Sequence, residues 1–314
     1  MVTEQDIAAA AKALRGGELV AFPTETVYGL GADATNDRAV AMVYAVKGRP
    51  AFNPLITHVP DAESAFGLGL FPETARTLAL AFWPGPLTLV VPRRDDCPVS
   101  LLASAGLDSI ALRVPAHPVA LQLLQATERP VVAPSANPSG RVSPTTAEHV
   151  RRHLAGKVAM VLDGGRCKVG LESTVVGFVD GEPPRLLRPG GLPRTDIERI
   201  AGVELAVELH ADRPHAPGQL LSHYAPQAEL RLHADAPCAG ESYLGFGPAH
   251  DHGPYNLSPS GDMVEAAANL FRLLHEIDAT GVGRIAVAPI PGQGLGEAIN
   301  DRLMRAAAPR EASS

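Results

Sequence analysis

Residues 18–31 read Glu18-Leu-Val-Ala-Phe-Pro-Thr-Glu-Thr-Val-Tyr-Gly-Leu-Gly31, a short apolar run that turns at once into a polar segment. The run Glu18–Phe22 predicts a β-strand, and Pro23 ends it because proline cannot donate to a strand ladder. The residues from Thr24 to Gly31 contain two glycines and show no clear period, so they predict a loop. A loop that follows a buried strand leaves the carboxyl edge of the sheet, where open α/β sheets bind ligands. A capped connector without a ligand would show the same pattern.

Predicted helices and strands alternate on both sides of this stretch. Thr3 and Asp6 have the spacing of a capping box for a helix over Thr3–Arg15, which the following two glycines would end. A second helix is predicted from Asp37 to about Val46. Further strands are predicted over Leu55–Val59, Leu87–Val91, Ser109–Val114, Pro130–Ala133 and Val158–Leu162, and helices over Glu73–Phe82, His117–Gln125 and Thr145–Leu154, with Thr145 as the cap. Strands interleaved with helices predict an open α/β sheet with helices packed on it.

The last third of the chain changes character. Ser173–Val179 and Arg185–Leu187 predict a hairpin around Asp180-Gly181, whereas Asp212–Gln219 carries two prolines and a glycine without an apolar period, which is typical of a linker. We therefore predict a larger domain over residues 1–202, a linker over 203–227, and a small Rossmann-like α/β domain over 228–314. In the small domain the pattern predicts strands over 230–233, 243–246 and 284–288, helices over 262–277 and from 297, and a frayed tail over 306–314.

Composition excludes several classes of protein. The chain has 314 residues, of which 46% are hydrophobic and 19% charged, as expected for a protein with a packed core. The 27 Lys and Arg against 34 Asp and Glu give a net charge of -7, which argues against indiscriminate binding to nucleic acid or anionic membrane. Three scattered cysteines favour a reducing compartment. Because no signal peptide and no membrane span are evident, we expect a cytoplasmic protein.

Cationic side chains gather at predicted strand and helix ends. In Lys47-Gly48-Arg49-Pro50, proline pushes Arg49 into extended backbone, where residues two apart point the same way. Two convergent cations beside a glycine suit phosphate oxygens. A solvated basic pair at a helix end is the alternative. Arg113 and Arg188 each follow an apolar strand and are expected to reach a pocket at the sheet edge, although structural ion pairs would explain them as well.

The loop from Ala133 to Thr145 is rich in hydroxyl and amide groups and precedes a predicted helix, so it could donate to a phosphate or a sugar. Loops also contain such residues for structural reasons. The phosphate-loop, nucleophile-elbow and zinc-protease signatures are absent. His149 and His153 have metal-compatible spacing but no third ligand nearby in sequence, and the glycines of Gly292–Gly296 predict a tight turn before the last helix.

Ten segments over residues 20–190 carry a family pattern in a fixed order. They are Phe22–Gly31, Lys47-x-Arg49-Pro50, Asn53-Pro-Leu55 with His58, Trp83–Thr88, Ile110–Pro118, Ala133–Asn137, Ser143–Thr145, Asp163–Gly165, Glu172–Thr174 and Leu187–Gly190. As a set they resemble the YrdC-type threonylcarbamoyl-AMP synthases. His223-Tyr224-Ala-Pro226 and Gly294-x-Gly296-x-Ala298 resemble the second domain of the longer form of that family.

The resemblance implies a twisted, open mixed sheet of YrdC type in the larger domain. It implies an enzyme, a nucleotidyltransferase that condenses L-threonine, bicarbonate and ATP into threonylcarbamoyl-adenylate and releases pyrophosphate. Magnesium is expected to enter with the phosphates, without a side-chain cage. A separate complex would then transfer the threonylcarbamoyl group to tRNA, so no stable contact with nucleic acid or membrane is expected.

The resemblance also assigns residues. Lys47 and Arg49 would be catalytic, and Arg113 would bind the threonine carboxylate as a fork. The remaining threonine contacts would be Thr24, His58, Ala133 and Ser173, and the nucleotide would meet Lys47, Arg49, Asn53, Ser109, Ser135, Asn137, Ser143, Arg188 and Tyr224. The stretch Pro217–Ser222 departs from the family, because Leu220-Leu221 stands where related linkers carry basic or aromatic residues.

Two other functions stay open at this point. An RNA-binding module would use the same pocket for tRNA, but the net charge of -7 and an aromatic content of only 4% weigh against it. An enzyme that makes a carbamoyl-adenylate from carbamoyl phosphate would carry a similar domain, but the partner domains that accompany such enzymes are not visible in this chain.

Overall fold

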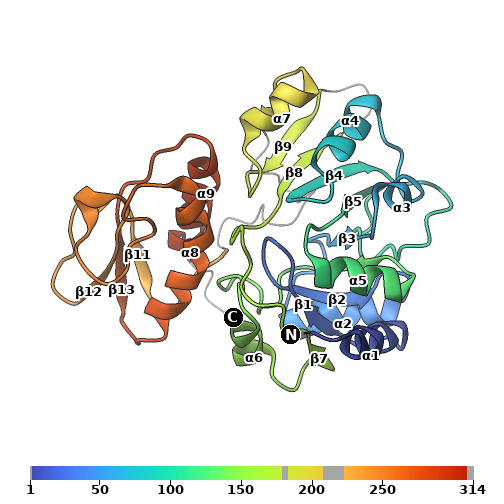
Figure 1. Ribbon diagram of the computed structural model, residues 1–314, viewed down its shortest axis with the longest axis horizontal. Coiled ribbons are helices and arrows are strands. Elements are labelled where there is room, and N and C mark those ends of the chain that lie inside the picture. Colours follow the sequence, from blue (N-terminus) through green and yellow to red (C-terminus); the bar gives the residue numbers. More distant parts are fainter. Residues whose placement is uncertain (1, 179–182, 208–222, 310–314) are drawn as a thin grey trace.

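The computed structural model describes residues 2–178, 183–207 and 223–309. It contains two bodies, a larger one built on a ten-stranded sheet and a smaller one built on a three-stranded sheet (Figure 1). The expected linker lies largely within residues 208–222, and the turn of the expected hairpin lies within 179–182. Both segments fall outside the described residues.

The large sheet is mixed, as the resemblance implied. Its strands lie in the order β10-β9-β8-β4-β5-β3-β6-β2-β1-β7, with parallel pairs such as β3 and β5 beside antiparallel pairs such as β4 and β5. Their bounds are β1 Val20–Phe22, β2 Gly29–Asp33, β3 Ile56–His58, β4 Leu87–Pro92, β5 Ser109–Arg113, β6 Val131–Val132, β7 Met160–Val161, β8 Thr174–Gly177, β9 Arg185–Arg188 and β10 Ala206–Val207. Because β10 pairs with β9, the sheet continues past residue 202.

Seven helices of the described residues surround this sheet. They are α1 Glu4–Arg15, α2 Asp37–Lys47, α3 Ala62–Phe66, α4 Glu73–Phe82, α5 Pro118–Thr127, α6 Ala147–Leu154 and α7 Arg194–Ala201. The capping box predicted for α1 is present, with Thr3 and Asp6 bonded reciprocally. Helices α1 and α5 pack with β1 and β6 in one apolar cluster. These two helices therefore cover the sheet at β1 and β6. Helices α3 and α7 were not predicted: α3 has only five residues, although Asp61 caps it, and α7 lacks a side-chain cap.

Two details differ from the sequence prediction. Residues 29–33 form β2 rather than a loop, because its glycines remove the alternation that identifies a strand. Glycine is required at position 31, where a Cβ would lie 2.8 Å from the Phe22 ring. The cap of α6 is Thr146 rather than Thr145, since the Thr146 hydroxyl accepts from the His149 backbone.

The smaller body is a parallel α/β unit. Its strands β11 Glu229–Arg231, β13 Arg284–Val287 and β12 Glu241–Leu244 lie side by side in that order, with helices α8 Met263–Asp278 and α9 Leu295–Ala307 and the 3-10 turn η1 Pro248–His250. The prediction of a small α/β unit is confirmed in its elements. The fraying predicted from residue 306 is wrong for Ala306, which is buried in α9; residues 310–314 lie outside the described part.

The two bodies share an apolar core. Helices α8 and α9 lie between the three-stranded sheet and the larger body (Figure 1). Val27, Val142 and Leu171 of the larger body belong to the same buried cluster as Leu270 and Phe271 of α8. Burial of apolar surface therefore joins the ligand loops predicted from sequence to the smaller body.

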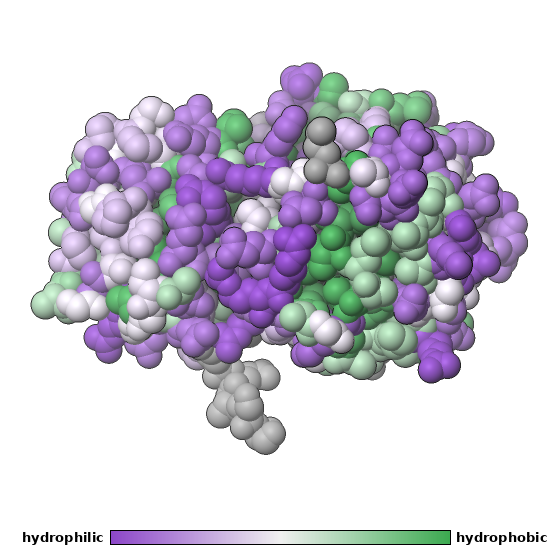
Figure 2. Space-filling view, turned by 60° about the horizontal axis from the view of Figure 1, so that its bottom comes forward, coloured by the Kyte–Doolittle hydropathy of each residue, from purple (hydrophilic) through white to green (hydrophobic). Residues whose placement is uncertain are grey.

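The surface that spans both bodies is polar on the face shown in Figure 2. Hydrophilic side chains gather in a band across the middle of the molecule, where the bodies meet, and an apolar area lies beside it. Within residues 2–178, 183–207 and 223–309, no helix combines the length and the hydropathy needed to cross a bilayer.

Three histidines meet where α6 contacts α8. The rings of His149 and His275 have centroids 4.0 Å apart, and the ring of His153 lies 5.7 Å from that of His275. Nε2 of His275 donates to the Ser143 carbonyl at 3.1 Å, and the Thr145 backbone donates to Nδ1 of His149 at 3.3 Å. The histidine pair singled out by its spacing thus lies at the contact between the two bodies.

This contact predicts a stability that falls in acid. Burial lowers the pKa of His149 to about 4 and that of His275 to about 3, the latter also through His149. Below pH ~6.5 the unfolded chain takes up these protons first, so the free energy of unfolding falls by up to ~1.4 kcal/mol per pH unit and group. We expect His275→Gln, which retains a donor for Ser143, to lose less stability between pH 7.5 and pH 5 than the wild type in urea unfolding. The exposed control His252→Gln should leave the slope unchanged; equal slopes in all three proteins would contradict the assignment.

Candidate active site

The loops that the sequence analysis selected meet at one pocket of the larger body. Its lining combines residues from eight separate segments, namely Val27, Arg49, Ile56, His58, Arg113, Ala133, Pro134, Ser135, Glu172, Ser173, Arg188, His223 and Tyr224. Ile56 and His58 are alternate residues of β3, so both side chains point to one face of the sheet. Ile56 also belongs to a small apolar cluster with Val90, Ala111, Val175 and Leu187. The pocket therefore lies over a sheet face near the strand ends rather than only at the carboxyl edge.

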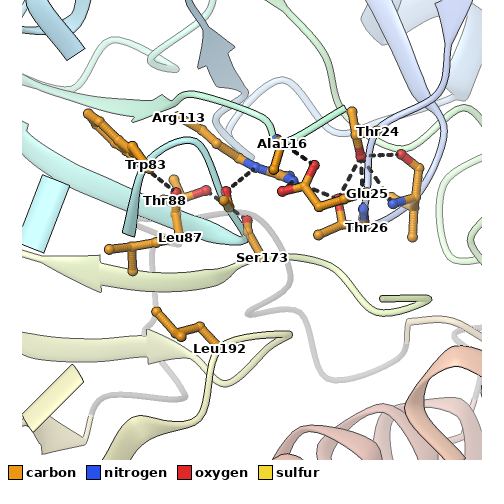
Figure 3. A network of polar contacts seen from close by, with 12 residues as sticks. Thr24, Glu25, Thr26, Trp83, Leu87, Thr88, Arg113, Ala116, Ser173 and Leu192 are labelled. Atoms are coloured by element: carbon orange, nitrogen blue, oxygen red, sulfur yellow. Dashed lines mark hydrogen bonds and ion pairs between the residues drawn. The ribbon is translucent and has the colours of Figure 1, made fainter. Parts of the chain in front are cut away.

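Arg113, the last residue of β5, lies in one end of the pocket and is paired with a buried carboxylate. Its Nη2 donates to Oε1 of Glu25 at 2.7 Å and to the hydroxyl of Thr26 at 2.8 Å (Figure 3). The second oxygen of Glu25 accepts from the Ala116 backbone at 3.0 Å. Arg113 is thus fixed by residues of the loop that follows β1 and by the Gly85 carbonyl, while its Nη1 has no hydrogen-bond partner in the part of the chain that the structure describes.

Thr24 lies beside this ion pair but does not line the pocket. Its hydroxyl donates to the Val27 carbonyl at 2.7 Å and accepts from the Val27 backbone at 3.2 Å, so it closes the turn of its own loop (Figure 3). Ser173 does line the pocket, and its hydroxyl bonds that of Thr88 at 2.7 Å and accepts from Arg188 at 3.1 Å. Of the expected threonine contacts, the structure therefore gathers His58, Arg113, Ala133 and Ser173 and places Thr24 behind them.

His58 is a neutral, oriented ring at the same end. Its Nδ1 lies 3.2 Å from the Ile56 carbonyl, which can only accept, so Nδ1 carries the proton and Nε2 is an acceptor. Phe22 packs edge-on against the ring, with centroids 6.5 Å apart. Burial, together with the positive charge of Arg113, lowers the pKa of His58 to about 3. The ring can therefore accept a hydrogen bond from a ligand at neutral pH.

Arg49 is buried at the other end of the pocket, which excludes the solvated basic pair considered from sequence. Its side chain is only 8% exposed, and Nη2 donates to Oδ1 of Asn53 at 2.6 Å and to the Pro54 carbonyl at 2.8 Å. Burial lowers the pKa of Arg49 to about 10, so the group remains a cation at neutral pH. Its Nη1 has no partner among the described residues.

Lys47 ends α2 and turns toward the hydroxyl-rich loop. Its Nζ donates to the carbonyls of Ser135 and Asn137, at 2.5 Å each. Burial, and after it Arg49, holds the pKa of Lys47 well below its usual value. Lys47 and Arg49 thus bond to different loops, and Lys47 adjoins the pocket through Ser135 rather than lining it.

Glu172 and Arg188 form the wall between the two ends. Arg188, the last residue of β9, donates through Nε and Nη2 to the Ser173 carbonyl at 3.1 and 2.8 Å. Glu172 accepts from the Ser143 hydroxyl at 2.5 Å and from Nε of Arg302 at 2.8 Å. Burial alone would raise the pKa of Glu172, but Arg302, Arg188 and Ser143 hold it below its ordinary value. Glu172 is therefore a carboxylate at neutral pH.

Several buried polar atoms around the pocket lack a protein partner. Among the described residues, Nδ1 of His223, the hydroxyl of Tyr224, Nδ2 of Asn53 and Oδ1 of Asn137 are buried without a hydrogen bond. Burial, followed by Arg49 and Lys47, holds the pKa of His223 well below its usual value, so its ring is neutral. Unpaired buried polar groups are costly and rare in native proteins, so this concentration is typical of a site that a polar ligand completes.

The expected nucleotide contacts are gathered with one exception. Arg49, Ser135, Arg188 and Tyr224 line the pocket, whereas Lys47, Asn53, Asn137 and Ser143 are hydrogen-bonded to lining residues or to one another. Ser109 does neither and begins β5 at the end remote from Arg113.

The sequence analysis missed three charged groups of this site. Glu25 and Glu172 were quoted as parts of family motifs, but no role was assigned to either carboxylate. Glu25 shortly follows one predicted strand and Glu172 directly precedes another, and these positions could have identified both. Arg302 gave no signal, because its partner Glu172 lies 130 residues away.

Metal binding by side chains alone finds no support in the described residues. Residues 2–178, 183–207 and 223–309 contain no group of three or more His, Cys, Asp or Glu side chains that could hold an ion. Glu172, which lines the pocket, is paired with Arg302, and Glu25 beside the pocket is paired with Arg113.

Comparison with known families places both bodies. Residues 12–190 match the Sua5/YciO/YrdC family model, described as "Telomere recombination", and residues 192–308 match the model described as "Threonylcarbamoyl-AMP synthase, C-terminal domain". The threonylcarbamoyl-AMP synthase of Pyrococcus abyssi is 42% identical over 97% of this chain and 95% of its own length. That of Bacillus subtilis is 41% identical over 98% of this chain and 94% of its own.

A solved structure agrees with the whole chain. The crystal structure of Pyrococcus abyssi Sua5 complexed with L-threonine superposes with a TM-score of 0.89 at 40% identity, covering 98% of this chain and 95% of that one. Escherichia coli YciO, at 22% identity and a TM-score of 0.55, covers 60% of this chain and shares the fold of the larger body.

Proposed function

Because this chain belongs to the Sua5/YrdC family of threonylcarbamoyl-AMP synthases, which are nucleotidyltransferases, we propose that its pocket condenses L-threonine, bicarbonate and ATP into threonylcarbamoyl-adenylate. The observation that carries this proposal is that one pocket joins two differently equipped ends. One end holds neutral His58 beside the Arg113–Glu25 pair, which suits the carboxylate and hydroxyl of an amino acid. The other end holds Arg49 and the loop that Lys47 supports, which suit phosphate oxygens.

The amino-acid end fits L-threonine by its chemistry. The unpartnered Nη1 of Arg113 would donate to the substrate carboxylate, while Glu25 keeps the guanidinium in place. Nε2 of His58 would accept a hydrogen bond from the ammonium or the hydroxyl group. The Pyrococcus abyssi relative was solved in complex with L-threonine, which supports the same class of ligand here.

The nucleotide end supports transfer by positioning. Bicarbonate supplies carbon dioxide by losing hydroxide, and the threonine amine adds to the carbon dioxide with loss of a proton, so that hydroxide and proton leave together as water. An oxygen of the resulting carbamate then attacks the α-phosphorus. A new P–O bond forms as the bond to pyrophosphate breaks, so Arg49, Arg188 and Lys47 would offset negative charge on the phosphoryl oxygens. A polyphosphate near Lys47 would itself favour the charged ammonium. No covalent nucleophile from the protein is needed.

Magnesium is proposed to enter as part of the ATP substrate. When bound, the ion neutralises phosphate charge and helps pyrophosphate depart. The residues fit this role, since the buried cations would face the phosphates while Glu25 and Glu172 stay in their ion pairs with Arg113 and Arg302. The product would pass to a separate tRNA threonylcarbamoyl-transferase complex in the same reducing compartment, and the net charge of -7 supports an enzyme that does not itself retain tRNA.

The proposal predicts a strict requirement for three substrates. With ATP, bicarbonate and L-threonine present, we expect release of pyrophosphate and formation of threonylcarbamoyl-AMP, measured by a coupled assay and by mass spectrometry. Omission of any one component should reduce the product to background. Pyrophosphate release that needs carbamoyl phosphate but not threonine would instead support a carbamoyl-adenylate enzyme, and salt-dependent tRNA binding without ATP turnover would support an RNA-binding module.

A further inference from the structure

Arg302 of α9 reaches from the smaller body to the wall of the pocket. Its side chain is 1% exposed, and Nε donates to Glu172 at 2.8 Å while Nη2 donates to the Pro189 carbonyl at 3.0 Å. The third nitrogen, Nη1, donates to Asp301 at 2.5 Å. All three nitrogens of the guanidinium therefore donate hydrogen bonds, and two of them bond to residues of the larger body. One of these residues, Pro189, directly follows Arg188 in the chain.

The same guanidinium also supports Tyr224. Its carbon lies 4.8 Å from the centroid of the Tyr224 ring, and Phe271 of α8 stacks on that ring at 5.7 Å. Tyr224 has a φ of 64°, a left-handed conformation that a tyrosine adopts only where its surroundings impose it. Arg302 and Phe271 of the smaller body therefore hold Tyr224 in place. Tyr224 lines the pocket and has a strained backbone.

Glu172 needs a positively charged partner other than the arginines that line the pocket. It is a buried carboxylate in a wall that also contains Arg188, and it holds the Ser143 hydroxyl of the nucleotide loop. Arg188 donates to Ser173 instead of pairing with Glu172. If Arg302 were absent, Glu172 would either bind a proton or recruit Arg188, because a buried charge without a partner is strongly unfavourable. Each outcome would remove a group from its place around the nucleotide.

We propose that Arg302 is a positioning residue of the pocket, through which the C-terminal body keeps Glu172 neutralised, Tyr224 in place and Arg188 directed to the ligand. That the nucleotide is ATP rests on the proposed function. The role of the smaller body in shaping the pocket goes beyond that function. Arg302 does not line the pocket but contacts Glu172 and Tyr224, which adjoin the expected nucleotide contacts, so its effect is expected on nucleotide binding rather than on threonine binding.

The test compares Arg302→Gln, which removes the charge, with Arg302→Lys, which retains it. For Arg302→Gln we expect the Kd and KM for ATP to rise about tenfold or more, and the KM for L-threonine to change less than about threefold. The acid limb of the pH–rate profile should move to higher pH, because Glu172 would be protonated more easily. Arg302→Lys should restore part of the ATP affinity. An ATP affinity within twofold of the wild type in folded Arg302→Gln would overturn the proposal.

Two further variants separate positioning from mere folding. Arg231→Gln removes another arginine–carboxylate pair of the smaller body, that with Glu241, far from the pocket lining; it should leave both KM values unchanged. In the double variant Arg302→Gln/Glu172→Gln, the loss of ATP affinity should be no greater than in the worse single variant, because the two residues act as a unit. Losses that multiply, or equal effects of Arg302→Gln and Arg231→Gln, would contradict the role.

The measurements also separate this inference from the proposed function. ATP binding is followed by calorimetry with the full chain, so the effect of Arg302 is seen without turnover. A wild-type protein that binds ATP but forms no threonylcarbamoyl-AMP would disprove the proposed function, while the comparison between variants would still decide the role of Arg302. If Arg302→Gln does not fold, Arg302→Lys and the double variant supply the same comparison.

Discussion

Replacement of Arg49 with alanine is expected to lower the rate of threonylcarbamoyl-AMP formation at least about 100-fold, within the range found when a preorganised charge-stabilising donor is removed. Arg49 supplies a buried cation with a fixed plane, because Asn53 and Pro54 hold one side of its guanidinium. Lysine at this position retains the charge but cannot bond the same acceptors together. Arg49→Lys should therefore also lose most of the activity, with a smaller loss of stability than Arg49→Ala.

Lys47→Ala is expected to have an effect of the same order through the hydroxyl-rich loop. Without its ammonium group, the carbonyls of Ser135 and Asn137 lose their donor, and the pocket loses a cation at its border. The measurement is single-turnover formation of the adenylate at saturating substrates, with circular dichroism and thermal unfolding to verify the fold. Arg38→Ala, an exposed cation at the start of the same helix, is the matched control. Turnover near that of the control in both Lys47 and Arg49 variants would remove the phosphate-binding assignment.

Arg113→Gln is expected to act at the opposite end of the pocket. The KM for L-threonine should rise by about 100-fold, because loss of one partner of a buried charge pair costs roughly 2–5 kcal/mol, and the KM for ATP should change little. Glu25 would be left as a buried carboxylate near the place where the substrate carboxylate binds, and like charges repel.

The control for Arg113 removes another arginine–carboxylate pair, in which the arginine is half-exposed and the carboxylate is buried. Arg129 donates to fully buried Asp33 at 2.6 Å and does not line the pocket. We expect Arg129→Gln to reduce stability but to leave the KM for L-threonine near that of the wild type. A rise in the KM for ATP that equals the rise for threonine in Arg113→Gln would show that the two ends of the pocket are not separate.

The sequence predicted most of the framework because its signals are local. The capping box of α1 and the alternation of strands and helices need only neighbouring residues, and both are present. Strand β2 was missed because Gly31 was selected by its contact with Phe22, which is a tertiary constraint that leaves no period behind. The sequence pattern therefore predicted the alternation of strands and helices, but it did not predict the glycine-containing strand β2.

The sequence predicted which residues lie at the site better than it predicted their hydrogen-bond and ion-pair partners. Proline after Arg49 correctly indicated a cation that leaves the helix, but not that Lys47 would turn to a different loop. The pairs Arg113–Glu25 and Glu172–Arg302 join residues 88 and 130 positions apart, and a single sequence carries no trace of such distances. Thr24 belongs to the same motif, and its hydroxyl makes a local bond to Val27 that no sequence pattern indicated.

The carbonyl groups that surround the cations have a consequence for the reaction itself. Arg49 and Arg188 are fixed by backbone oxygens of the loops and strands that carry the pocket. Ordering a long side chain normally costs up to about 2 kcal/mol of conformational entropy. Here that cost is met when the chain folds, so an arriving polyphosphate would meet dipoles and charges that need little reorganisation. Much of the catalytic advantage of this protein would then be stored in its folded state before any substrate binds.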